Sequence, residues 1–265
     1  MQPSLRHQAI IAIVAGIVFF TNLGVPRLWD RDEPRNAGCA AEMWERGDWV
    51  VPTFNSELRT HKPALLYWLM MSAYSVFGVN EFSARLWSAL LGIATCLLTY
   101  QIGRRLYSPR AGLWAGIVLA TALNFGVAAR AATPDSVFVF SVTFVLWLFV
   151  GGLFPSADKS LQQESGILWQ HPTLTTYIWA YLAMGVAVLA KGPIGILLPG
   201  GTAGLFLLYA TYTTHRSKSE LASDDREGGG WKSLILSVLR PFAPLHVMRT
   251  IWAMRPFLAM GLVAL

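Results

Sequence analysis

Seven long apolar runs, separated by polar segments, constrain the fold of this chain more than any other feature of its sequence. The hydrocarbon core of a bilayer is roughly 30 Å thick, and a helix that rises about 1.5 Å per residue needs about 20 apolar residues to cross it. We predict membrane spans over residues 9–25, 82–102, 111–129, 136–154, 173–190, 194–212 and 251–265. The predicted fold class is therefore all-α, a polytopic transmembrane helical protein.

The composition argues against a water-soluble domain. Of the 265 residues, 54% are hydrophobic and 14% are charged, and the mean hydropathy is +0.45, whereas a soluble surface needs more charge. The net charge of +6 would suit nucleic acid, but no basic helix lies outside the loops between the runs, so we expect no nucleic-acid partner. Two cysteines, Cys39 and Cys96, are too few for a disulfide framework. No small-residue cleavage site precedes Pro26, so we expect the first run to be an uncleaved anchor.

The distribution of Lys and Arg predicts the orientation of the spans, because cytoplasmic loops are enriched in these residues. A shorter apolar run, residues 64–77, would form only about 21 Å of helix, so we place it at the membrane interface. Apart from residues 29–71, the external side then keeps only Arg85, Arg130 and Lys191. The cytoplasmic side holds eleven basic residues: Arg6, Arg104, Arg105, Arg110, Lys159, Arg216, Lys218, Arg226, Lys232, Arg240 and Arg249.

Residues 29–71 form a polar stretch between the apolar runs, and this stretch is where we expect a site. Small and aromatic residues recur with helical spacing over residues 34–46, and Gly47 ends the pattern. We predict two interfacial helices in this first external loop, over residues 34–46 and 63–77. An ordinary surface helix is the alternative for the first of them.

Asp32 and Glu33 are adjacent carboxylates at the start of the first of these helices. A carboxylate near a low-dielectric boundary can act as a general base toward a hydroxyl, which makes both catalytic candidates and Asp32 the preferred one. The alternative is helix capping, which the pair alone favours, because acidic side chains stabilise the positive end of a helix. Asp30 and Asp32 also form a DxD pattern, which is too common to predict a metal site.

Arg59, His61 and Lys62 form a small cationic group before the second predicted helix. Cations at this level can hold a lipid phosphate and neutralise the charge that develops on it, so Arg59 and Lys62 are candidate phosphate ligands. Contact with anionic head groups of the bilayer is an equally good explanation. His61 is a further site candidate, but no cluster of His, Cys and Asp surrounds it, so we predict neither a metal site nor another cofactor.

Arg130, Asp135 and Lys191 border apolar runs on the predicted external side. Thr133, Pro134 and Asp135 would start a helix well, and Lys191 beside a glycine would end one. Ionisable residues beside membrane spans are nevertheless site candidates. We therefore treat Arg130 and Lys191 as candidate phosphate ligands and Asp135 as a further site candidate.

These residues lie in sequence blocks that resemble a known family. The sequence resembles the bacterial GT-C glycosyltransferases, the superfamily of the dolichyl-phosphate-mannose protein mannosyltransferases and of the aminoarabinose transferase acting on lipid A. The resemblance implies an inner-membrane enzyme that moves a sugar, with inversion, from a polyprenyl phosphate to an acceptor hydroxyl on the external, periplasmic face. The matching blocks, within residues 9–200, are DEPRNAGCAAEMWERGDWVVP, HKPALLYWL, FGVNEFSARLWSALLG, GRRLY, ARAATPD and LAKGP.

The resemblance also implies roles by position. Asp32 corresponds to the acidic residue that is the candidate base, Glu33 is its neighbour, and Lys62 corresponds to the lysine that contacts the donor phosphate. The implied acceptor is lipid A, a protein or another glycan. His61 departs from the family, because the aminoarabinose transferases often have an acid there. The chain is also shorter than the family, so we expect it to be the N-terminal half.

Two other functions stay open from the sequence. A transporter or lipid flippase would also have many spans, but it predicts paired repeats and charges near mid-span, which the sequence lacks. An inactive remnant that binds polyprenyl phosphate would share the same site residues. The transferase needs no metal in this interpretation, because basic side chains can neutralise the modest charge of a phosphate leaving group.

Overall fold

The computed structural model describes residues 3–154, 169–220 and 242–264, and these residues form α-helices and one short β-hairpin. The hairpin pairs Thr53 with Leu58 and Phe54 with Glu57. The elements are α1 (Pro3–Phe20), α2 (Asp32–Arg46), β1 (Thr53–Phe54), β2 (Glu57–Leu58), α3 (Leu65–Phe77), α4 (Glu81–Leu106), α5 (Pro109–Thr121), α6 (Leu123–Arg130), α7 (Pro134–Leu153), α9 (Leu174–Lys191), α10 (Ile194–Glu220), α12 (Pro244–Ala253) and α13 (Pro256–Ala264).

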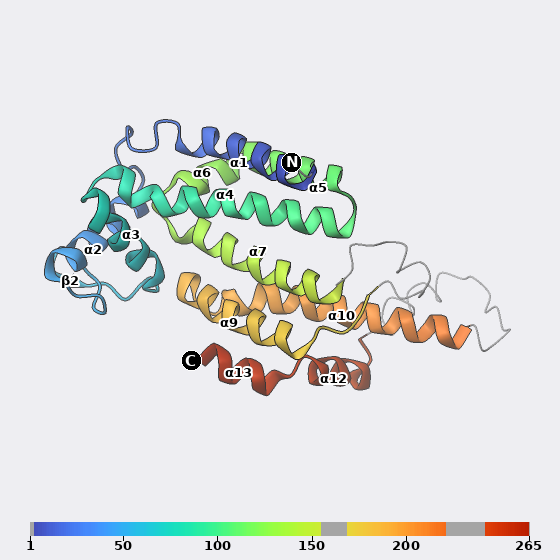
Figure 1. Ribbon diagram of the computed structural model, residues 1–265. Helices are drawn as coiled ribbons and strands as arrows, with labels where there is room; N and C mark the ends of the chain where they lie inside the picture. The colour runs from blue at the N-terminus through green and yellow to red at the C-terminus, as the bar shows by residue number, and fades with distance from the viewer. Residues whose placement is uncertain (1–2, 155–168, 221–241, 265) are drawn as a thin grey trace.

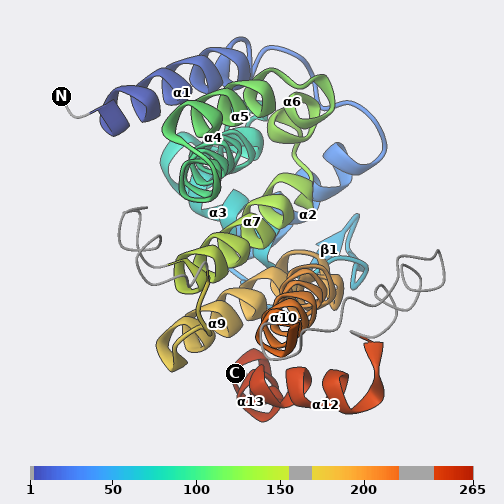
Figure 2. The same ribbon diagram turned by 90° about the vertical axis from the view of Figure 1, so that its right-hand side faces the viewer.

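The all-α polytopic fold is confirmed. Among the described residues, four helices are long and apolar enough to cross a membrane: Glu81–Leu106, Pro134–Leu153, Leu174–Lys191 and Ile194–Tyr212. The helices α5 and α6, which meet at an angle of 65°, add a fifth if they form one broken span. Figure 1 shows the long helices side by side, and Figure 2, which looks along them, shows the bundle extending from α1 to α12 and α13.

Three predicted spans differ from the helices observed. The helix predicted over residues 9–25 is α1, which begins at Pro3 and ends at Phe20 because the chain turns at Asn22, with φ of 56°. The run 111–129 is interrupted at Ala122, whose backbone is extended. A single helix over 251–265 is wrong: α12 and α13 are separated at Arg255, whose φ is 54° and which precedes a proline that disfavours the helical conformation before it.

The helices predicted over residues 34–46 and 63–77 are α2 and α3. The left-handed conformation of Gly47, with φ of 65°, ends α2. A capping box between Asn80 and Ser83 starts α4, and Ser108 caps α5. The predicted polar loops over residues 155–172 and 213–249 fall largely outside the described residues, together with Lys159, Arg226, Lys232 and Arg240.

Close helix packing builds the bundle. Helices α4 and α5 approach so nearly at Gly103 and Gly112 that a Cβ on Gly112 would lie 2.5 Å from the carbonyl oxygen of Tyr100. Small residues allow this approach, as they do in other membrane bundles. The core around Tyr67 and Met70 of α3 joins α2 and α3 to the ends of α4, α7 and α9.

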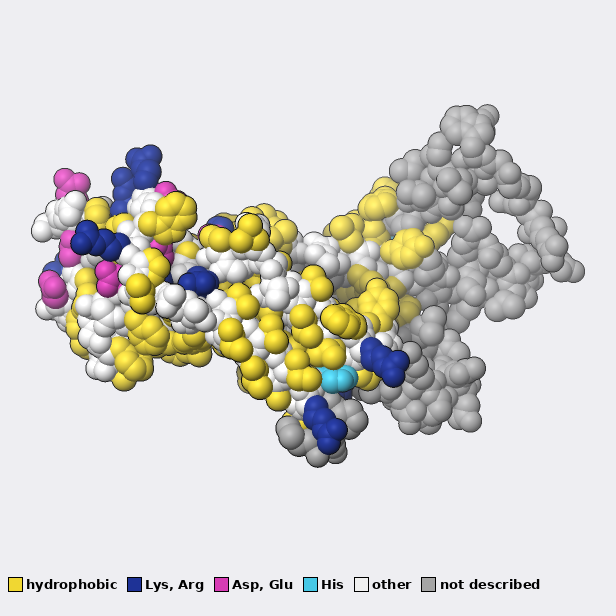
Figure 3. Space-filling model, turned by 90° about the horizontal axis from the view of Figure 1, so that it is seen from above, with side chains coloured by type: hydrophobic (Ala, Val, Ile, Leu, Met, Phe, Trp, Pro, Cys, Tyr) yellow, Lys and Arg dark blue, Asp and Glu magenta, His cyan; other side chains and the backbone are white. Residues whose placement is uncertain are grey.

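This packing places α2 and α3 at one end of the bundle, over the start of α4 and α7 (Figure 1). Charged side chains gather at that end, and hydrophobic side chains cover the middle of the bundle (Figure 3). Trp114 and Leu197, for example, are 65% and 69% exposed. An apolar belt with a polar end is the surface expected of a protein that crosses a bilayer.

Candidate active site

Asp32 and Lys62 form an ion pair at the polar end of the bundle. Asp32 is the first residue of α2, and Lys62 lies in the turn before α3, so the packing of these two helices brings them together. The carboxylate Oδ2 of Asp32 lies 3.6 Å from Nζ of Lys62, and the side chains are 49% and 31% exposed. The site therefore offers an acid and a cation that a ligand can reach.

Glu33, in contrast, is buried and fully engaged with the protein. Its Oε1 accepts hydrogen bonds from Nε of Arg85 at 2.9 Å and from the amide of Ala132 at 2.7 Å. Its Oε2 accepts from Nη2 of Arg85 at 2.7 Å and from the amide of Trp29 at 3.0 Å. A carboxylate has about four acceptor positions, so Glu33 has none left for a substrate. The structure thus argues against Glu33 as a catalytic residue.

The environment of Glu33 also keeps its carboxylate charged. Burial alone would raise the pKa of Glu33, but the hydrogen bonds from Arg85, Ala132 and Trp29, together with the charge of Arg85, outweigh burial and lower it. A buried carboxylate whose pKa is lowered in this way is suited to holding neighbouring groups rather than to accepting a proton.

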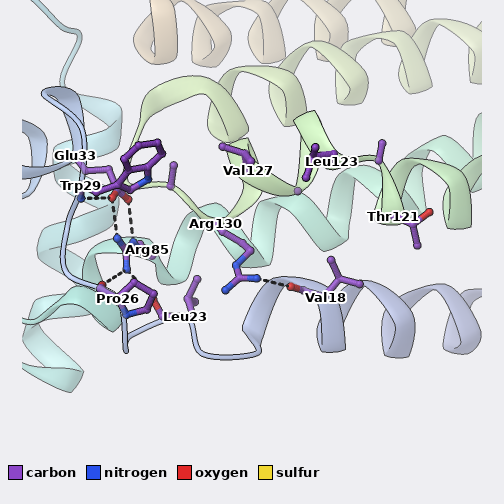
Figure 4. A pocket seen from close by; sticks show the side chains of 13 residues that line it. Val18, Leu23, Pro26, Trp29, Glu33, Arg85, Thr121, Leu123, Val127 and Arg130 are labelled. Carbon is purple, nitrogen blue, oxygen red and sulfur yellow. Dashed lines mark hydrogen bonds and ion pairs between the residues drawn. The ribbon is translucent and has the colours of Figure 1, made fainter.

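Arg85 uses all five of its guanidinium hydrogens within the protein. Two bonds go to Glu33, and the others go to the carbonyls of Leu23 at 3.0 Å, Pro26 at 2.7 Å and Arg27 at 3.1 Å. Figure 4 shows Glu33 and Trp29 above this guanidinium and Pro26 below it. Arg85 therefore ties the linker between α1 and α2 to the start of α4, next to Asp32.

Asn36 extends this network along α2. Its Nδ2 donates to the carbonyl of Ala132 at 3.1 Å. Glu33 and Asn36, one helical turn apart, therefore bind the N–H and the C=O of Ala132. Asn36 Oδ1 accepts from Nη2 of Arg59 at 3.2 Å, and Arg59 lies over the ring of Phe54 with 9% exposure. The structure therefore places Arg59 beneath the site, where it supports α2, and not at the surface as a phosphate ligand.

Arg130 binds the last turn of α1. Its guanidinium donates to the carbonyls of Val18 at 3.3 Å and Thr21 at 2.7 Å, which are among the carbonyls that a helix end leaves without partners. It lines a pocket of about 360 Å³ beside the break between α5 and α6, together with Glu33 and Arg85. Figure 4 shows the Arg130 side chain directed toward Val18 and away from Glu33. This geometry favours a structural role for Arg130 over a direct phosphate contact.

Asp135 and Lys191 form a second exposed ion pair, between the start of α7 and the end of α9. The ammonium of Lys191 also lies 5.5 Å from the centre of the Phe138 ring. Because Phe138 and Ala190 belong to the core that carries α2 and α3, this pair stands at the same end of the bundle as Asp32 and Lys62. Two of the three predicted acids, Asp32 and Asp135, and both predicted lysines are thus brought to one end.

His61 is exposed, and nothing in its surroundings marks it as a ligand. Over the part of the chain that the structure describes, no group of three or more His, Cys, Asp or Glu side chains is placed to hold a metal ion.

Sequence reasoning missed Asn36 and Arg85. A signal was present for each: Asn36 interrupts the apolar face of its helix, and Arg85 lies within the first turns of a long apolar helix, where a charge needs a partner. The partner of Arg85 is 52 residues away, and sequence spacing gives no means of finding it.

Comparison with known proteins identifies the family. A family model for dolichyl-phosphate-mannose-protein mannosyltransferases matches residues 61–157. The chain is 32% identical to an uncharacterised protein of Aquifex aeolicus over 205 residues, and this alignment covers 77% of the chain and 38% of that protein. It is 30% identical over 193 residues to an undecaprenyl phosphate-alpha-4-amino-4-deoxy-L-arabinose arabinosyl transferase of Pseudomonas fluorescens, over 72% of this chain and 31% of the relative.

A solved structure agrees with these relatives. The crystal structure of ArnT from Cupriavidus metallidurans bound to undecaprenyl phosphate matches with a TM-score of 0.63 and 28% identity, over 97% of this chain and 41% of ArnT. The chain belongs to the GT-C superfamily. This GT-C protein spans less than half the length of the relatives it matches.

Proposed function

We propose that this GT-C protein is part or all of a membrane glycosyltransferase that moves a sugar from a polyprenyl phosphate to an acceptor hydroxyl. One observation carries the proposal: Asp32 and Lys62 lie 3.6 Å apart and partly exposed, at the polar end of an apolar bundle. This pair supplies a base and a phosphate-binding cation at the level of lipid head groups. The undecaprenyl phosphate named for two of the matched proteins supports a polyprenyl phosphate donor.

The two residues act on opposite sides of the reaction. Asp32 accepts the proton of the acceptor hydroxyl while the oxygen of that hydroxyl attacks the anomeric carbon of the sugar. The bond from that carbon to the phosphate oxygen breaks on the far side, which inverts the sugar, and Lys62 neutralises the charge growing on the departing phosphate. The 3.6 Å separation exceeds the roughly 2.7–2.9 Å of a tight charged hydrogen bond, so Lys62 can turn toward a phosphate.

The other charged residues take supporting places in this proposal. Lys191 is a second, exposed phosphate contact, and Asp135 orients it. Glu33, Arg59 and Arg130 hold the site from beneath, because each already binds protein groups.

We place the site on the external face of the inner membrane, with α2 and α3 lying along the membrane surface. The 13 residues of α3 give only about 20 Å of helix, too short to cross. The opposite end of the bundle carries Arg104 and Arg105 in the last turn of α4 and Arg110 in the first turn of α5. Basic loops favour the cytoplasmic side, which leaves Asp32 outside.

The substitution Asp32→Asn tests the base. Sugar transfer is measured in membranes that contain the full-length protein encoded by the gene. We expect transfer from a labelled polyprenyl-phosphate sugar to fall at least about 100-fold, because a general base contributes about that much or more. Glu45→Gln removes another exposed carboxylate of α2 and should leave the rate unchanged.

Lys62 is tested in the same assay. Lys62→Gln should lower the rate strongly, and Lys62→Arg should restore part of it because the positive charge returns.

A wild-type rate in Asp32→Asn, or an equal loss in Glu45→Gln, would remove Asp32 from this role.

A further inference from the structure

A second pocket lies between α10, α12 and the segment before α9. Figure 1 shows α12 at the end of the bundle away from α2 and α3. The volume of this pocket is about 380 Å³. The residues that line it, within the part of the chain that the structure describes, include two histidines and an arginine but no Asp or Glu. The charge that the pocket offers to a ligand is therefore positive. The lining residues are His171, Leu207, Thr211, Tyr212, His246, Arg249, Thr250 and Ala253.

The protein holds one polar side chain of this pocket, that of His246, in place. His246 Nε2 lies 3.1 Å from the carbonyl oxygen of Leu208 and 3.2 Å from Oγ1 of Thr211. A carbonyl only accepts, so Nε2 carries a hydrogen and fixes the imidazole against α10. Arg249 is exposed, and within the described ranges its guanidinium has no hydrogen-bond or ion-pair partner. A guanidinium in this position can bind an anion.

Helix α12 also presents an apolar face beside the pocket. The four pocket residues of α12 follow the i, i+3, i+4, i+7 spacing of one helix face. On the neighbouring face, Leu245, Met248 and Trp252 are 63%, 68% and 70% exposed. Arg249 stands between the two faces. A cationic pocket thus borders an apolar surface that the described residues leave uncovered. This combination fits an amphiphile with an anionic head and hydrocarbon chains.

We propose that this pocket binds the phosphate head group of an anionic membrane phospholipid, whose acyl chains lie along the exposed face of α12. The apolar span of α10 ends at Tyr212, which lines the pocket. The pocket is therefore at the height of the lipid head groups, where Lys and Arg attract anionic lipids. The inference does not depend on the proposed transferase activity.

Native mass spectrometry of the purified full chain in detergent tests this site through bound lipid, with no need of an activity. The probes are phosphatidylglycerol and phosphatidylcholine with identical acyl chains, and inorganic phosphate as a competitor. We expect the wild-type chain to bind phosphatidylglycerol more tightly than phosphatidylcholine. Arg249→Gln should weaken phosphatidylglycerol binding about fivefold and leave phosphatidylcholine binding unchanged.

Arg110→Gln is the matched control, because Arg110 is exposed at the same end of the bundle but outside the pocket. It should bind both lipids as the wild type does. If Arg249→Gln does not fold, His171→Gln makes the same test from the other side of the pocket. Equal affinity for the two lipids, an equal effect of both arginine substitutions, or complete displacement of the lipid by an equal concentration of inorganic phosphate would each overturn the proposal.

Discussion

Replacing Arg85 with leucine should destabilise the chain strongly. The substitution leaves the charge of Glu33 buried without its partner, and it frees the carbonyls of Leu23, Pro26 and Arg27. Removing one member of a buried ion pair costs about 3–5 kcal/mol. The partly exposed pair of Asp32 and Lys62 should contribute only about 0–1 kcal/mol, so we expect Lys62→Gln to leave stability almost unchanged.

The measurement is the free energy of unfolding of the purified chain in detergent micelles, obtained from helicity during a denaturant titration. The double variant Glu33→Gln with Arg85→Leu provides the internal control. It should be less unstable than the sum of the single variants, because the buried charge disappears along with its partner. A loss below about 1 kcal/mol in Arg85→Leu, or additive losses in the double variant, would refute the role given to this pair.

The buried groups Glu33, Cys39 and Asn36 of α2 give three more predictions. Folding lowers the pKa of Glu33 below its ordinary 4.5, so the stability that its carboxylate contributes is present above pH 4.5 and is lost as the pH falls through the lowered pKa. Glu33→Gln should therefore reduce the dependence of the unfolding free energy on acid pH, and an unchanged pH profile would contradict this role of Glu33. Burial raises the pKa of the Cys39 thiol, so maleimide should label Cys39 only after unfolding, and rapid labelling of the native chain would be the contrary result. Asn36→Ala leaves the carbonyl of Ala132 and a guanidinium hydrogen of Arg59 unpaired and should cost about 1–3 kcal/mol of unfolding free energy, whereas no loss would show that neither bond matters.

The sequence predicts the helices well, because their signals are local. Hydrophobic runs of sufficient length, the glycine after α2 and the caps of α4 and α5 each act within a few residues. The errors fall where one residue's backbone decides the outcome. Arg255, which precedes a proline, ends α12, and the extended Ala122 bends a predicted span into two helices.

The candidate site was only partly predictable for a different physical reason. Asp32 and Lys62 could be chosen from charge and from the resemblance to a family, since both are polar residues between apolar runs. Sequence cannot distinguish an exposed carboxylate from its buried neighbour Glu33, because that difference depends on Arg85, which is 52 residues away. Arg130 shows the same limit, since its carbonyl partners are more than 100 residues away.

The affinity of the purified chain for a polyprenyl phosphate tests most directly whether Asp32 and Lys62 form a lipid-phosphate site. The comparison is between the wild type, Lys62→Gln and Arg110→Gln. Loss of a charged hydrogen bond should weaken binding at least about tenfold in Lys62→Gln, with Arg110→Gln unchanged. Equal affinity in all three chains would show that Lys62 does not hold the phosphate.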